Sequence, residues 1–123
     1  EPLVPCYIVK KDLVLLSLSA LDFSFFVEEN MSEIFALFHK YQIKVDLIQN
    51  SAISFSVCVD NKFNNIDKLI EFLKAKFKMS FNKGVSLYTI RHFDQEAINR
   101  IEKDKEILLK QTTRETIQFV VME

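Results

Sequence analysis

The most regular hydrophobic pattern in the chain lies in residues 53–60, where apolar and polar side chains alternate strictly. A period of two predicts a β-strand with one face on a core and the other open to water or to a partner. Residues 43–48 alternate less cleanly, and the turn-tolerant Gln49, Asn50 and Ser51 separate the two segments, so we expect a β-hairpin. Its inward positions are Ile53, Phe55, Val57 and Val59, and its outward positions are Ser54, Ser56, Cys58 and Asp60.

The chain before this hairpin predicts two strands and a helix. After an extended lead-in, residues 6–9 predict a short edge strand, whereas residues 13–19 are apolar on both faces, as in a central strand. Residues 20–29 have an irregular pattern and predict a long loop. Asn30 and Glu33 then form a capping pattern at the start of an amphipathic helix that runs to about residue 41.

After the hairpin, residues 66–77 carry an apolar stripe at helical spacing, and residues 79–81 predict a short strand. The resulting order is β-α-β-β-α-β, which is the ferredoxin-like arrangement of two helices on one face of an antiparallel sheet. The sequence therefore predicts an α+β fold with a lead-in and edge strand at residues 1–12 and a first domain at residues 13–83.

Gly84 marks a restart, and residues 84–123 predict a second, incomplete unit of strand, helix and hairpin. Asp94 is placed as the N-cap of its helix. The segments LIQNSAISFSVCV and LLKQTTRETIQFVVM resemble each other, with Asn50 and Ser51 echoed by Gln111 and Thr112. Because this unit stops after three strands, its sheet must be completed by the strand around residues 7–9, by the first domain or by another copy of the chain.

Composition excludes several classes of function. The 123 residues contain sixteen basic and seventeen acidic side chains, which gives no electrostatic footprint for nucleic acid or an anionic membrane. No apolar run reaches the roughly 18 residues needed to span a bilayer. The single glycine excludes a Gly-rich phosphate-binding loop. Two cysteines, Cys6 and Cys58, are too few for a disulfide scaffold, so we expect free thiols and a cytoplasmic protein.

The sequence offers no catalytic or metal-binding constellation. His39 and His92 have no metal-ligand spacing to Cys6 or Cys58, and neither cysteine lies beside a basic run that would activate it. RNA-binding modules share the ferredoxin-like order, but the outward positions of residues 53–60 are small and polar rather than aromatic. A pure dimerisation module is the stronger rival to a ligand-binding one, because a small-residue sheet face and an incomplete unit both suit a partner sheet.

The block SEIFALFHKYQIKVDLIQNSAISFSVCVD resembles the first ACT module in the regulatory region of aspartate kinases. In that family a helix is followed by a strand of the type I-x-V-D-[LM]-[IV] and then by a Ser-rich strand, and the likeness is specific over residues 13–60. The resemblance implies two tandem ferredoxin-like ACT modules that pair side by side and bind an amino-acid effector at their interface. It also implies that the chain is the non-catalytic C-terminal part of an enzyme that phosphorylates L-aspartate with ATP in lysine, threonine and methionine biosynthesis. ATP and magnesium would belong to the kinase domain, and no cofactor is expected in this chain.

The resemblance also implies where the effector binds. In lysine-sensitive relatives the effector is held by the loop after the first strand, the beginning of the first helix, and a V-D-L-I-x-x-S segment. The corresponding residues are Asp22, Ser24, Asn30, Met31, Ser32, Val45, Asp46, Gln49, Asn50 and Ser51. Lysine is favoured because Asp46 can oppose a second positive charge, while threonine would need only hydroxyl partners such as Gln49 and Asn50. The alternative is an ACT-like dimerisation module without a ligand.

Overall fold

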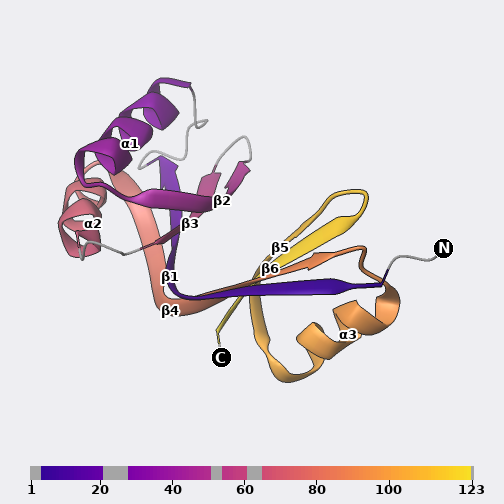
Figure 1. The fold of residues 1–123 in the computed structure, drawn as a ribbon. Helices are drawn as coiled ribbons and strands as arrows, with labels where there is room; N and C mark the ends of the chain where they lie inside the picture. The colour runs from indigo at the N-terminus through magenta and orange to yellow at the C-terminus, as the bar shows by residue number, and fades with distance from the viewer. Residues whose placement is uncertain (1–3, 21–27, 51–53, 61–64, 123) are drawn as a thin grey trace. The chain divides into compact units, whose positions relative to one another are not determined.

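The computed structural model describes residues 4–20, 28–50, 54–60 and 65–122 (Figure 1). The strands form one six-stranded sheet with the order β2-β3-β1-β4-β6-β5. The chain divides into a first unit, Val14–Lys83, and a second unit, Glu1–Leu13 with Gly84–Glu123. The elements are β1 (Cys6–Ala20), α1 (Glu28–Lys40), β2 (Lys44–Asn50), β3 (Ser54–Asp60), α2 (Ile66–Lys74), β4 (Phe77–Arg91), α3 (Gln95–Asp104), β5 (Glu106–Thr112) and β6 (Thr116–Met122).

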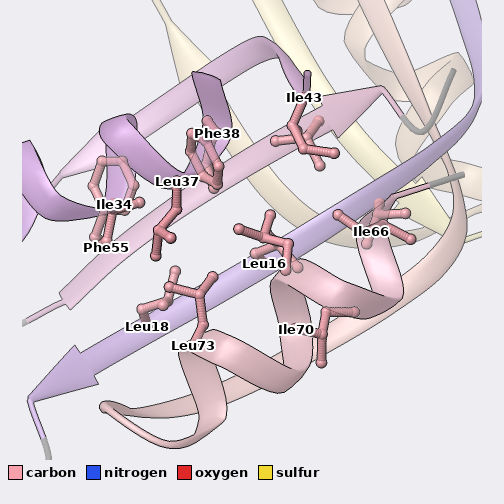
Figure 2. Packing of buried hydrophobic residues seen from close by; sticks show 14 of the residues in the cluster. Leu16, Leu18, Ile34, Leu37, Phe38, Ile43, Phe55, Ile66, Ile70 and Leu73 are labelled. Carbon is pink, nitrogen blue, oxygen red and sulfur yellow. The ribbon is translucent and has the colours of Figure 1, made fainter. Parts of the chain in front are cut away.

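The first unit has the predicted β-α-β-β-α-β order. The later part of β1 and β3 are its central strands, while β2 and the first part of β4 lie at its edges, as in the ferredoxin-like arrangement. Both helices cover the same face, because their apolar side chains pack in one cluster with alternate residues of the strands (Figure 2). This confirms the expected α+β fold.

The core of the first unit is rich in aromatic side chains. Phe55 is fully buried, and its ring meets that of Phe35 edge-on, with centroids 5.8 Å apart. Phe35 makes a second edge-on contact with Phe38 at 5.7 Å. Such pairs add about 0.5–1.5 kcal/mol beyond the burial of their area. They fix α1 against β3, opposite the end of β2, where Phe55 pairs with Asn50.

The edge strand β2 departs from the predicted alternation because it contains a β-bulge. Val45 lies opposite Val59, but the next pair is Leu47 with Cys58, so Asp46 is the extra residue. A bulge reverses the faces of all later side chains. Val45 therefore packs with the helix-side core, whereas Leu47, which regular alternation would place on the same side, shares the opposite face with Cys58. This explains the irregular pattern of residues 43–48.

The second unit is completed by the N-terminal part of β1, which is the first of the three alternatives left open by the sequence. Its strand order is β1-β4-β6-β5, so β1 is the edge strand beside β4. Its core joins α3 to one face of β4 and β6. Among the residues that the structure describes, this unit has one helix, α3. The exposed fractions of Tyr7, Ile8 and Val9 on β1 are accordingly high, at 41%, 53% and 43%.

The two hairpins repeat each other residue by residue. The β5–β6 pair has its own bulge between Ile107 and Leu109, and every pair of the β2–β3 ladder has a counterpart 62 positions later. The burial patterns of β3 and β6 are identical. The repeat seen in the sequence is thus structural, but shifted by one residue, because Asn50 corresponds to Thr112 rather than to Gln111.

Four local predictions need correction. Asn30 lies inside α1 rather than at its N-cap, since the helix already begins at Glu28. Phe77 begins β4 and does not end α2. The two strands predicted before residue 20 are one continuous strand. The strands predicted before and after Gly84 are also one strand, because its left-handed conformation (φ 69°) is accommodated within β4, although the second unit does begin at Gly84.

Candidate functional site

The first turn of α1 and the end of β2 meet at one contact. The Asn50 side-chain amide donates to the Met31 sulfur at 3.6 Å. Asn50 lies on the helix side of the sheet, since it is paired with the buried Phe55. Asn30, Met31 and Ser32 follow the first residues of α1 and are at least partly exposed. The structure thus brings the two described parts of the expected effector site together at one end of the first unit.

Asp46 lies on the same strand as Asn50 and is half-buried at the bulge. The bulge releases it from the regular alternation of side chains, which is how a strand can redirect one residue at a functional edge. The bulge residue at the matching position of the second unit is the apolar Leu108. The two hairpins therefore share a backbone but differ in charge at this position.

The structure separates two other predicted residues from this cluster. Val45 packs against the helix-side core near the start of β2, whereas Asn50 ends that strand. Gln49 is exposed and is paired with Ser56, which places it on the face opposite Asn50. Asn50 and Gln49 were also predicted as turn residues, and both are within β2. Asp22, Ser24 and Ser51 lie outside the described residues.

The opposite face of the first unit has a feature that the sequence only hinted at. Serine side chains from β1, β3 and β4, together with Lys78, line a hollow there. Ser17 and Ser56 are neighbours there, with hydroxyl oxygens 3.5 Å apart. The alternation of serine in residues 17–19 and 54–56 is the signal that could have located it. The face is not open along its whole length, since Cys58, which we expected on a water-facing surface, is fully buried. The lining residues are Ser17, Leu18, Ser19, Ser54, Lys78, Met79 and Ser80.

The described part of the chain contains no cluster of metal ligands. No group of three or more His, Cys, Asp or Glu side chains could hold a metal ion among those residues. Cys6 is exposed and Cys58 is buried, and both are free thiols. None of the described helices is long and apolar enough to cross a membrane.

Comparison with known proteins relates this fold to the regulatory regions of aspartate kinases. No family model and no curated protein sequence matches the chain. E. coli aspartokinase III in complex with lysine and aspartate superposes with a TM-score of 0.72 at 18% identity, over 94% of this chain and 29% of that enzyme. A C-terminal regulatory domain attributed to aspartate kinase of Porphyromonas gingivalis W83 gives 0.72 at 17% identity, over 96% of this chain and 86% of that one. Clostridium acetobutylicum aspartate kinase superposes with a TM-score of 0.73 at 13% identity, over 94% of this chain and 30% of that enzyme.

These neighbours confirm the resemblance seen in the sequence at the level of the fold. The chain spans less than a third of the E. coli and Clostridium enzymes and covers 86% of the isolated regulatory domain. At such low identity the shared feature is the arrangement of strands and helices. One fold can serve many functions, and the function depends on the chemistry of the site that the fold carries.

Proposed function

We propose that this chain is an amino-acid-binding regulatory region of an aspartate kinase and that the effector is free lysine. The observation that carries the proposal is the contact of Asn50 with Met31, which joins the end of β2 to the first turn of α1. This contact places the N-terminal turn of α1 beside the Asn50 amide. Asn50 lies on β2, the strand that also carries the Asp46 carboxylate. The neighbours add support, since one of them was solved with lysine and aspartate.

Each part of the ligand has a chemical counterpart. The first backbone N–H groups of a helix have no partner within the helix, and its dipole favours an anion there, so the α-carboxylate of lysine would bind the first turn of α1. Because α1 begins at Glu28, these groups lie slightly earlier in the chain than Asn30. Asp46 would balance a positive charge of lysine, and Asn50 and Ser51 would supply hydrogen bonds. Threonine has no second positive charge and would use only the amide and hydroxyl groups.

Regulation would follow from differential binding. Inhibition requires only that lysine bind the inactive arrangement of the whole enzyme more tightly, and a coupling of about 1–3 kcal/mol is typical. The kinase domain that responds would hold ATP and magnesium. In this proposal the present chain performs no catalysis.

Asp46→Asn should weaken lysine at least about tenfold, which is about 1.4 kcal/mol, because it keeps the shape of the side chain and removes its charge. Titration calorimetry with lysine and threonine, on wild type and variant, measures this directly. The melting temperature without ligand should stay nearly unchanged. Gln49→Ala is the matched control, because Gln49 lies on the opposite face of the same strand and should leave lysine binding unaltered.

Equal lysine affinity in wild type and Asp46→Asn would show that Asp46 does not balance the ligand charge. Threonine binding without lysine binding would identify the other effector. If neither amino acid binds wild type, the dimerisation module without a ligand is the better description.

A further inference from the structure

The outer side of α2 carries an aromatic side chain that does not belong to the core. The buried residues of this helix are Ile66, Leu69, Ile70 and Leu73. Phe72 lies off that stripe and is 41% exposed. Next to it is a hollow of about 330 Å³, and we call the residues around it the Phe72 surface. They are Lys68, Glu71, Phe72, Ala75 and Lys76 from α2 and the turn after it, with Lys40 from the last turn of α1.

Lysine side chains flank the exposed ring. The ammonium nitrogens of Lys76 and Lys40 lie 5.5 Å and 5.9 Å from the centroid of the Phe72 ring, within the range of cation–π attraction. Lys76 also forms an ion pair with Glu33. No ion pair within the described part of the chain involves Lys40 or Lys68. The surface therefore combines an apolar centre with positive charges that are available to a partner.

We propose that the Phe72 surface docks an acidic peptide segment of another protein, with one apolar side chain as its anchor. The anchor would fill the hollow beside Phe72 and Ala75, whose exposed lining is almost wholly apolar. Carboxylates on either side of the anchor would meet Lys40 and Lys68. An aromatic contact buried at the centre and surrounded by charged groups is the arrangement that concentrates binding energy in protein interfaces.

Charge favours a protein partner over a nucleic acid. Glu71 lines the hollow itself, and Glu33 neutralises Lys76 at its margin. A phosphate backbone would be repelled by Glu71, whereas a peptide can place its carboxylates only where lysines lie. The whole chain has a net charge of −1, so no broad positive field attracts a polyanion. The docking surface shares no residue with the proposed effector site, so the two proposals stand or fall separately.

The test is a selection from a random dodecapeptide phage library on the full 123-residue chain. Wild type should enrich peptides with net negative charge and one aromatic or large aliphatic residue. For the enriched peptide, anisotropy should show at least about tenfold weaker binding to Phe72→Ser and to Lys68→Glu, and weaker binding at high salt. Phe81→Ser is the matched control, because Phe81 is also exposed (38%) and flanked by Lys74 and Lys83 but does not line the hollow.

Three results would overturn the proposal. The first is the enrichment of neutral or basic peptides. The second is an equal loss of peptide binding in Phe81→Ser and in Phe72→Ser. The third is competition by single-stranded oligo(dT) at a concentration equal to or lower than that of the peptide, which would assign the surface to nucleic acid. Because neither phenylalanine belongs to the buried core, all variants should fold, and circular dichroism checks that they do.

Discussion

At the scale of single residues, the stability of the first unit depends on which face of β3 a side chain occupies. Phe55 is fully buried against Phe35, whereas its neighbour Ser54 is partly exposed beside the serine-lined hollow. The two residues are adjacent in the sequence, yet they contact different surroundings. A shift of the strand by one residue would exchange them.

Phe55→Ala should lower the free energy of unfolding by about 3–5 kcal/mol, because it leaves a cavity where the ring met α1. Ser54→Ala should change it by less than about 1 kcal/mol, since no core contact is lost. Urea denaturation followed by circular dichroism measures both values. Equal losses in the two variants would contradict the strand register described here.

At the scale of elements, α3 shows how the sequence marks the start of a helix. The Asp94 carboxylate accepts a hydrogen bond from the Ala97 backbone N–H at 2.8 Å, as its predicted N-cap position requires. The helix is short, and its buried residues are Ala97, Ile98 and Ile101. A helix of ten residues with so small an apolar face depends on its cap more than a long helix does.

Asp94→Ala should therefore destabilise the chain by about 1 kcal/mol, within the range of 0.5–2 kcal/mol typical for such caps. Asp104→Ala is the matched control, because it makes the same change at the last residue of α3. Removing a negative charge from a helix C-terminus should be neutral or slightly stabilising. Thermal melts compare the two variants, and a larger loss for Asp104→Ala would reverse the assigned roles.

At the scale of the whole molecule, two long strands serve both units. β1 and β4 each contribute one part to the first unit and another to the second. Each contains a left-handed residue within two positions of the unit boundary, Asp12 in β1 (φ 60°) and Gly84 in β4 (φ 69°). The second unit therefore takes its edge strand from the beginning of the chain, and its β1 edge remains apolar and exposed.

This edge leads us to expect a homodimer, because an exposed apolar edge strand pairs readily with another copy of itself. Sedimentation should show dimers at tens of micromolar, roughly the range where a weak interface still assembles. Ile8→Lys should abolish the dimer, because a charge on an edge strand opposes pairing. Ile48→Lys is the control on β2, an edge strand of the first unit, where Ile48 is 37% exposed. A wild-type monomer, or equal effects of both variants, would contradict the expectation.

The candidate site was only partly predictable from the sequence. The resemblance pointed to Met31, Asp46 and Asn50, and the structure brings Met31 and Asn50 together at 3.6 Å. It could not show that Gln49 lies on the opposite face, because a bulge leaves no distinctive residue type in the sequence. Nor could it locate the Phe72 surface, since a phenylalanine beside a helical stripe looks like one more core residue until the helix is packed.

The sequence by itself determined the succession of helices and hairpins and the core-facing side of β3, because these depend on side-chain period and on local caps such as Asp94. It also carried the repeat of the two hairpins. Only the tertiary structure decided how the strands pair over long distances. The tertiary structure attaches residues 6–9 to the second unit. It also continues β4 through Gly84. Pairing between distant strands is set by the burial of whole faces and by backbone hydrogen bonds, which no local pattern of residues encodes.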